Sequence, residues 1–341
     1  MTSFQDFCPR ENFLPTTKSL GQMKSLLRKA GIGGLALRLY HRPLHRLRDC
    51  LREGGPWQQR RTELGRQDME MAAYKLPLLA AHSGAPLELH LLTGRRFWYQ
   101  TAFCLWTLGY HADRPLAPVI YDDGTLVKAH RDALTRLFPT SRFVAEAETI
   151  ARLDAYLPTE HFPVIRERWL NYPNLRKLID PHLGSSGWKL VLDSDLLFFR
   201  KAVLLENWLD APDAPLHAVD VANAYGYSDK LLNSLISAPL PQRLNVGLCG
   251  LRSEELDWER IEYLCGTLID AEQTNYYLEQ ALVALLLAGR KCAIAPADDY
   301  VTLPVLPEAE TCSAVMHHYV ANSKRWYFQF NWRRCLPTSS A

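Results

Sequence analysis

The chain has 341 residues, of which 48% are hydrophobic and 22% charged, and its formal net charge is +2. Such a chain can bury a sizeable core, either in one large α/β domain with additions or in two small domains. Its longest apolar run, Ala281–Ala288, is too short to cross a bilayer, which excludes a membrane-spanning helix. The eight cysteines are scattered without a Cys-x-x-Cys pair, which excludes a disulfide framework or a zinc cluster.

Charge is unevenly distributed along the sequence. Residues 24–66 hold 11 Lys and Arg against 3 Asp and Glu, a local excess of +8 that leaves −6 for the remainder. This asymmetry indicates either a region that faces an anionic partner or a solvated helical layer whose arginines pair with the acidic body. The polar opening, with Pro9 and Pro15, is unlike a signal peptide. We therefore expect a cytoplasmic protein, with peripheral membrane contact through residues 24–66 as one option.

Residues 1–82 are interpreted as a basic, helical N-terminal extension, and residues 83–341 as the main domain. From Met23 to Ala81 the pattern is helical, interrupted by glycines and prolines. Leucines interleave with arginines, as in a basic amphipathic helix that packs on the body or lies on a membrane surface. These leucines are Leu26, Leu27, Leu35, Leu37, Leu44 and Leu47.

A strand–helix alternation begins at Ser83. It predicts an α/β fold with a mixed, mainly parallel, Rossmann-like sheet that is covered by helices on both faces. In the C-terminal tail, aromatic residues occur at every second position from Trp326 to Trp332, a pattern typical of a strand. The expected strands are 87–92, 118–121, 142–144, 189–195, 216–221, 245–251 and 291–295, and the expected helices are 96–108, 127–137, 150–157, 164–179, 253–268 and 275–288.

The segment from Lys189 to Phe199 carries the strongest functional signal. Its apolar run ends in Asp193 and Asp195, and apolar residues resume at once. On an extended strand, residues two apart point to the same face, so we expect the two carboxylates to converge. Paired carboxylates repel each other and lose hydration unless a cation compensates, and hard oxygen ligands suit Mn²⁺ or Mg²⁺. The alternative is a solvated surface turn.

Other polar residues fall at the expected carboxyl ends of strands, where α/β sheets bind their ligands. Thr93 and Gly94 end the first strand, and Asp123 follows the second. Asp220 ends the strand at 216–221, where an acceptor-side base is one interpretation and a plain strand end the other.

Four short motifs occur in a fixed order along the chain. Asp193-Ser-Asp195 is followed by Asn245-Val-Gly247 and by Glu279-Gln280 at the start of an apolar helix. Near the C-terminus, His318 precedes Lys324 by six residues and Trp326 by eight. Together they resemble the family 8 glycosyltransferases, enzymes of the GT-A fold with an Asp-x-Asp motif and a closing His-Phe-x-Gly-x-x-Lys-Pro-Trp motif. The resemblance covers roughly residues 86–332.

The resemblance implies a metal-dependent glycosyltransferase that uses a nucleotide diphosphate sugar, most often a UDP-sugar, with retention of configuration. It implies that Asp193, Asp195 and His318 bind Mn²⁺ or Mg²⁺, which would neutralise the charge of the leaving diphosphate. It further implies that Asn245, Glu279 and Gln280 are catalytic residues near the donor sugar. The remaining implied donor-binding residues are Thr93, Gly94, Asp123, Arg176, Lys177, Gly247 and Lys324, together with Asp193.

The closing motif departs from the family pattern. Ala321 stands in place of its glycine, Arg325 in place of its proline, and Glu279 in place of an aspartate. These departures leave retention versus inversion open. Of the adjacent histidines, we expect His318 to be the ligand, because it alone has the spacing to Lys324 and Trp326, and His317 to be a packing residue.

Two other functions fit parts of the sequence. A nucleotidyltransferase of related α/β fold also uses paired carboxylates, but it usually has a glycine-rich phosphate loop, and only Gly94 follows the first strand. A non-enzymatic nucleic-acid-binding protein could use the basic N-terminal helices, yet residues 24–66 contain only Tyr40 and Trp57 as stacking aromatics. Nucleic acid is therefore the less favoured partner, and the acceptor (glycan, lipid or protein) is not encoded in any motif.

Overall fold

The structure is a computed structural model that describes residues 54–337. By its internal contacts the chain divides into two compact units, Met1–Arg60 and Arg61–Ala341. Residues 61–82, assigned from sequence to the N-terminal extension, fall within the second unit. The expected leucine-rich helix at residues 26–47 lies outside the described residues. None of the helices in residues 54–337 has the length and apolar character needed to cross a membrane.

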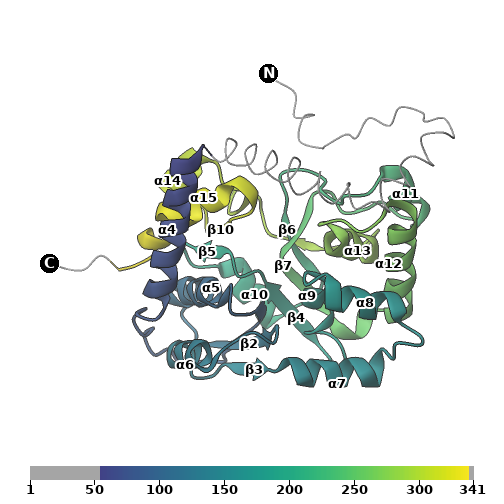
Figure 1. The fold of residues 1–341 in the computed structure, drawn as a ribbon, viewed down its shortest axis with the longest axis horizontal. Helices are drawn as coiled ribbons and strands as arrows, with labels where there is room; N and C mark the ends of the chain where they lie inside the picture. Colours follow the sequence, from purple (N-terminus) through teal and green to yellow (C-terminus); the bar gives the residue numbers. More distant parts are fainter. Residues whose placement is uncertain (1–53, 338–341) are drawn as a thin grey trace, which may run out of the picture. The chain divides into compact units, whose positions relative to one another are not determined.

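A seven-stranded sheet forms the centre of the second unit, in the order β3-β2-β1-β4-β7-β6-β8 (Figure 1). All neighbouring strands are parallel except β7, which runs antiparallel to both β4 and β6. This sheet confirms the mixed, mainly parallel α/β fold class. The strands are β1 (Leu87–Thr93), β2 (Leu116–Asp122), β3 (Arg142–Val144), β4 (Trp188–Leu192), β6 (Leu216–Val219), β7 (Leu244–Arg252) and β8 (Ala293–Ile294).

Helices cover both faces of this sheet, which explains why its central strands are apolar runs rather than alternating ones. In β7, Leu248 packs into the cluster around α5, whereas its neighbour Cys249 packs into the cluster around α12 and α13. The helices are α5 (Trp98–His111), α6 (Lys128–Leu137), α7 (Glu146–Tyr156), α8 (Pro163–Asn171), α9 (Leu175–Ile179), α10 (Val203–Asp210), α11 (Asp229–Ser234), α12 (Trp258–Glu272), α13 (Leu278–Leu286) and α14 (Leu306–Thr311).

A second, three-stranded sheet has the order β5-β10-β9 and comprises β5 (Leu196–Phe198), β9 (Tyr300–Thr302) and β10 (Met316–His318). Strand β10 runs antiparallel to β5, with His318 opposite Leu196. Because Leu196 directly follows Asp195, this register brings the C-terminal histidine to the aspartate pair. The sequence patterns predicted neither β9 nor β10, since strands of three residues carry little periodicity.

The expected helix 164–179 is two helices, α8 and α9. Pro173 separates them, because proline disfavours helical backbone in the residue before it and lacks the N–H that a continuous helix needs. The expected helix 253–268 begins with a short 3₁₀ turn, Ser253–Glu255, and then continues as α12.

The C-terminal aromatic tail is helical, so its strand-like interpretation is wrong. It consists of η4 (Ala321–Ser323), α15 (Lys324–Trp326), the π-helical turn η5 (Tyr327–Asn331) and α16 (Trp332–Arg334). The buried residues of this tail are 327, 328, 329, 331 and 332, so burial does not alternate as it would on a half-buried strand. Alternation of aromatic residues alone was therefore misleading.

Helix α4 (Pro56–Ala73) is the one described helix of the predicted N-terminal extension. Its C-terminal half packs into the main core through Met69 and Ala73, and Thr62 accepts a hydrogen bond from the side chain of Gln329 at 2.9 Å. From Arg61 onward this helix is therefore a structural part of the second unit.

Candidate functional site

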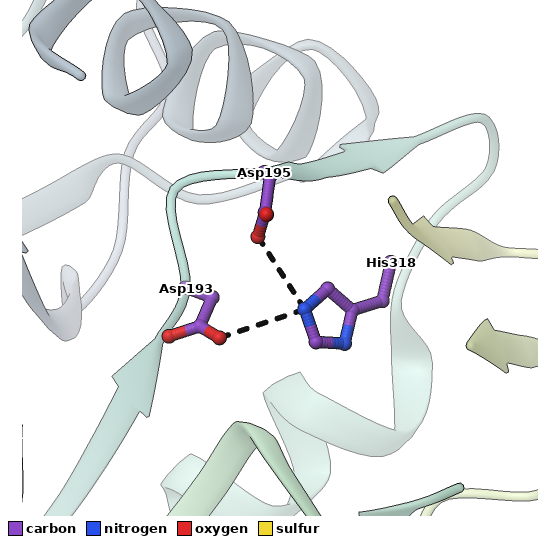
Figure 2. A group of neighbouring side chains, drawn as sticks. All are labelled: Asp193, Asp195 and His318. Carbon is purple, nitrogen blue, oxygen red and sulfur yellow. Dashed lines mark ion pairs between the residues drawn. The ribbon is translucent and has the colours of Figure 1, made fainter. Parts of the chain in front are cut away.

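The aspartate pair lies in the turn between β4 and β5. Asp193 directly follows β4, and Asp195 directly precedes β5. The expectation of one extended strand is therefore wrong, and the convergence of the carboxylates comes from the turn. Figure 2 shows both side chains directed toward the ring of His318. The chain thus brings together at one point the three residues that were proposed as metal ligands, Asp193, Asp195 and His318.

The geometry of this group leaves space between its members. One ligand atom from each residue lies within 4.8 Å of the others. The Nε2 atom of His318 is 3.5 Å from Asp193 Oδ2 and 3.4 Å from Asp195 Oδ1, longer than a normal N–H···O bond. This Nε2 is buried and has no hydrogen-bond partner among the described residues. A buried ring nitrogen that is aimed at two carboxylates without bonding either one suits a cation held between them.

The other ring nitrogen of His318 is fixed by Asn245. Nδ1 lies 3.0 Å from Asn245 Oδ1, which also accepts the Gly247 N–H at 2.9 Å. Because Oδ1 is an acceptor, Nδ1 carries a proton, and this bond turns Nε2 toward the two carboxylates. A Cβ on Gly247 would lie 2.2 Å from His318 Cε1, so glycine at this position makes room for the ring.

Burial and neighbouring charges shift the pKa values of the three residues in this group. Burial opposes a charged His318, but the carboxylates of Asp193 and Asp195 raise the pKa of His318 to about 9. Burial also disfavours the charged forms of both aspartates, yet Lys177 lowers the pKa of Asp193, and Lys324 lowers the pKa of Asp195. The site therefore favours a positive charge between two ionised carboxylates, as a divalent cation would provide.

Two lysines flank the carboxylates. Lys177 Nζ is 2.6 Å from Asp193 Oδ1 and 3.1 Å from Glu279 Oε2. Lys324 Nζ is 3.1 Å from Asp195 Oδ2. Burial raises the pKa of Glu279 to about 7, against the opposing effect of Lys177. The structure thus places Glu279 against Lys177.

Arg176, adjacent to Lys177, points elsewhere. Its guanidinium bonds Asp180 at 3.1 Å, Glu146 at 3.1 Å and the carbonyl of Asp122 at 3.2 Å, and it stacks on Trp169 at 4.3 Å. Each of its three nitrogens donates one of these bonds, which fix α9 against neighbouring elements, so Lys177 is the member of this pair that reaches the metal group.

A second polar cluster adjoins the first through Asn245. Asp220 Oδ2 accepts from Asn245 Nδ2 at 3.0 Å and from Gln280 Nε2 at 3.3 Å. Gln280 also donates to the carbonyl of Ala224 at 2.8 Å. Asn245 therefore connects the metal group to a carboxylate just after β6 and to an amide on α13.

Thr93, Gly94 and Asp123 lie together at the carboxyl ends of β1 and β2. The carboxylate of Asp123 lies over Gly94, where a Cβ would approach it to 2.0 Å, and Thr93 accepts from the Thr101 hydroxyl at 2.8 Å. Among residues 54–337, no hydrogen bond or ion pair joins these three residues to the metal group. They form a separate part of the same sheet edge.

Sequence reasoning assigned no role to Tyr172. Its hydroxyl accepts from the Glu279 N–H at 3.3 Å and donates to the carbonyl of Tyr276 at 2.7 Å, so it holds the start of α13 and the loop before it. An isolated tyrosine before a proline belongs to no motif, so the sequence offered no signal for it.

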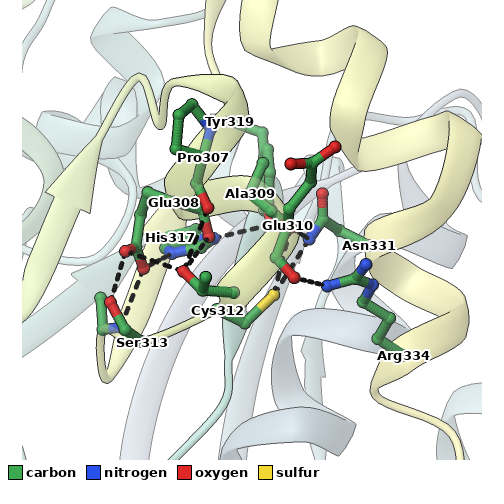
Figure 3. A network of polar contacts seen from close by, with 12 residues as sticks. Pro307, Glu308, Ala309, Glu310, Cys312, Ser313, His317, Tyr319, Asn331 and Arg334 are labelled. Carbon is green, nitrogen blue, oxygen red and sulfur yellow. Dashed lines mark hydrogen bonds and ion pairs between the residues drawn. The ribbon is translucent and has the colours of Figure 1, made fainter.

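His317 lies on the opposite face of β10 in a closed network. Its Nε2 is 2.7 Å from Glu308 Oε1, and its Nδ1 is 2.9 Å from the Tyr319 hydroxyl. Glu308 also accepts from Ser313 and from the Ala314 N–H (Figure 3). With both ring nitrogens bonded, His317 is a packing residue, as expected from its spacing.

The chemistry of the three ligand side chains fits a divalent cation. Two carboxylates and one imidazole suit Mn²⁺ and also permit Mg²⁺, and the unbonded, buried His318 Nε2 is the observation that supports occupancy. The hydrogen bond that Nδ1 donates to Asn245 Oδ1 is of the kind that orients metal-bound histidines.

No family model matches this sequence, and no curated protein matches it. Among solved structures, the galactosyltransferase LgtC in complex with donor and acceptor sugar analogues is similar at 13% identity and a TM-score of 0.48, over 74% of this chain and 97% of that one. The apo form of mouse xyloside xylosyltransferase 1 is similar at 12% identity and a TM-score of 0.44, over 70% and 99%. Values this low assign neither a family nor an activity to the chain.

Proposed function

We propose that this protein is a metal-dependent glycosyltransferase of the GT-A type that uses a nucleotide diphosphate sugar, and that this donor is a UDP-sugar. The observation that carries the proposal is the group of Asp193, Asp195 and His318 at the carboxyl edge of the sheet, with the buried Nε2 unbonded. The order of the four sequence motifs supports it independently. Sheet edges of this kind are where α/β proteins bind nucleotides.

In this proposal, Asp193, Asp195 and His318 hold Mn²⁺ or Mg²⁺. The ion supplies positive charge to the donor diphosphate, on which negative charge grows during transfer. Lys324 adds a second positive charge beside Asp195, and Lys177 keeps Asp193 ionised and in place. Glu279 acts through Lys177 and is a positioning residue.

The cluster of Asp220, Asn245 and Gln280 is proposed to surround the donor sugar. During transfer the acceptor oxygen bonds to the anomeric carbon, while the bond from that carbon to the phosphate oxygen breaks and leaves its electron pair on the diphosphate. The acceptor proton passes to a base, for which Asp220 is one candidate and a phosphate oxygen another. Thr93, Gly94 and Asp123 are proposed to contact the nucleoside, and the sequence resemblance alone supports retention of configuration.

The direct test is a thermal-shift screen of nucleotide sugars with Mn²⁺, with Mg²⁺ and with EDTA. A donor at about 100 times its Kd stabilises the fold by roughly 2.7 kcal/mol, which is readily measured. We expect stabilisation by a UDP-sugar only when the cation is present. Equal stabilisation in EDTA would contradict the metal site. Analysis of the products then distinguishes a glycosyltransferase from a nucleotidyltransferase. Sugar transfer releases a nucleoside diphosphate, whereas nucleotidyl transfer releases pyrophosphate.

A first prediction concerns Gln280. Gln280→Ala should lower kcat about tenfold to a hundredfold and leave nucleotide affinity nearly unchanged, because its amide contacts Asp220 and not the metal group. Steady-state kinetics together with calorimetric UDP binding measure the two quantities. Gln329→Ala is a suitable control, as another buried glutamine remote in sequence from this cluster. Unchanged kcat would remove Gln280 from the proposed sugar site.

The basic segment 24–66 is proposed to dock the protein on an acceptor or on a membrane surface, and a cytoplasmic location is part of the same proposal. Since α4 packs from Arg61 onward into the main core, a truncation should begin at Gly54 and keep that helix. Donor binding should survive this truncation. Sedimentation with anionic vesicles, compared between the full chain and the truncated chain, tests the membrane contact. A salt-dependent titration with nucleic acid tests the less favoured partner.

A further inference from the structure

A small cavity adjoins the metal group from the side of the hydrophobic core. Helices α9 and α13 bound it on one side, and strands β4 and β7 bound it on the other (Figure 1). Most of its wall is aliphatic, but the polar side chains of Lys177, His182 and Glu279 also line it. Lys177 and Glu279 form the ion pair beside Asp193. The cavity therefore connects a buried histidine to the residues that flank the proposed metal ligands.

His182 has one ring nitrogen bonded and one unbonded. The side chain is 2% exposed, and its Nδ1 lies 3.0 Å from Ser253 Oγ. Its Nε2 is buried and has no hydrogen-bond partner among residues 54–337. Because Ser253 does not belong to the cavity wall, the other edge of the ring, with Nε2, is the edge that faces the cavity. A buried polar atom in this position costs free energy unless a ligand or a water molecule satisfies it.

Lys177 has a further donor available on the same cavity wall. Its ammonium group carries three N–H donors. Asp193 Oδ1, at 2.6 Å, and Glu279 Oε2, at 3.1 Å, account for two of them, and no third acceptor is found within residues 54–337. A water molecule is held in a cavity when it makes about three hydrogen bonds to otherwise unpaired polar groups. Lys177, His182 and the Glu279 carboxylate can supply that number.

We propose that this cavity binds a water molecule that bridges His182 Nε2 to the Lys177–Glu279 pair, and that His182 is thereby a positioning residue for Asp193. The assignment of Asp193 as a metal ligand rests on the proposed function, whereas the water site does not. None of the four sequence motifs contains His182. Without the water, one N–H of Lys177 would face an aliphatic wall, so the ammonium and the Asp193 carboxylate would be held less firmly. Partners of this kind, one step removed from the metal, set the position of its ligands.

The first part of the test is crystallographic and uses the full chain. We expect the wild type to show ordered solvent density within hydrogen-bond distance of His182 Nε2 and of Lys177 Nζ. Val283→Ile adds one methylene to the cavity wall and should displace this density. Val144→Ile is the matched control, since Val144 is a buried valine that does not line the cavity. Absence of density in the wild type would overturn the water site without any variant being made.

The second part separates the two ring nitrogens by Mn²⁺ titration of the full chain. An asparagine amide can replace Nδ1 and keep the bond to Ser253, whereas the longer glutamine can replace Nε2 and reach the water. We expect His182→Asn and Val283→Ile to weaken Mn²⁺ binding about tenfold, and His182→Gln and Val144→Ile to bind it nearly as the wild type does. Thermal unfolding verifies that each variant is folded.

The outcomes distinguish this inference from the proposed function. If the wild type binds no Mn²⁺, the metal site of the proposed function fails, and the density alone decides the water site. If the density is present but His182→Asn and Val283→Ile bind Mn²⁺ like the wild type, the positioning role of His182 is wrong. If His182→Gln is as impaired as His182→Asn, the bond to Ser253 is what matters, and the water-mediated role is overturned.

Discussion

His317 and His318 are neighbours on β10, but their side chains lie on opposite faces of the strand and differ in how their ring nitrogens are bonded. His317 has both ring nitrogens bonded, to Glu308 and Tyr319, and burial lowers the pKa of His317. His318 has one nitrogen fixed by Asn245 and the other unbonded between two carboxylates, which raise its pKa to about 9 against the opposing effect of burial. A satisfied network stabilises a fold, whereas a buried polar atom without a hydrogen-bond partner costs free energy unless a ligand or an ion satisfies it.

The largest expected effect comes from removing charge at the open site. Asp195→Asn keeps the shape of the side chain but removes its negative charge, so we expect loss of Mn²⁺-dependent turnover by at least about a hundredfold. Kinetics with a UDP-sugar and thermal shift with Mn²⁺ measure it. Asp210→Asn is the control, an exposed aspartate paired with Arg114 on the surface. Full activity in Asp195→Asn would remove the main support for the metal site.

The two histidines can be compared directly. His318→Ala should abolish cation binding and also lower the free energy of unfolding of the cation-free protein, because it removes the positive charge that the two buried carboxylates favour. His317→Ala should leave cation affinity nearly intact but lower that free energy by about 2 kcal/mol, since it leaves Glu308 and Tyr319 without their partner. Urea unfolding measures the free energy of unfolding of each variant, and titration with Mn²⁺ measures its cation affinity. Identical phenotypes would show that the two faces of β10 are not separate in function.

The closed network also predicts a pH dependence. Although burial opposes ionisation, bonds from Ser313 and His317 lower the pKa of Glu308 to about 2 from an ordinary value of 4.5. A depressed carboxyl pKa adds stability above the unfolded value, and that stability is lost as the pH falls from 4.5 toward 2. The stability difference between wild type and Glu308→Gln should therefore shrink over this interval. A difference independent of pH would show that Glu308 acts by shape alone.

The smallest expected effect is at Ala321, between His318 and Lys324. Its φ is +45°, a left-handed conformation that costs an L-residue about 1 kcal/mol and glycine little. Ala321→Gly should raise the melting temperature by a few degrees without loss of cation binding. Calorimetry measures the gain. A lower melting temperature would mean that the restricted backbone of alanine stabilises this turn more than its strain destabilises it.

Much of the site follows from local sequence. The apolar run into Asp193 and Asp195 and the strand ends at Thr93 and Asp123 were readable from residue order, whereas the choice of His318 over His317 came from the resemblance to the family's closing motif. The α/β class was also readable from residue order, because central strands covered on both faces must be continuous apolar runs. These features depend on periodicity and on chemistry that acts within a few residues.

Only the tertiary structure decided how distant segments meet. The antiparallel register of β10 on β5 puts His318 beside a turn more than a hundred residues earlier, and strands of three residues leave no periodic trace of that pairing. Packing likewise sets the partners of Lys177, the position of Arg176 away from the metal group, and the helical form of the tail from Lys324 onward. Hydrogen bonds and ion pairs depend on distances in space, and sequence order does not determine those distances for residues brought together by long-range contacts.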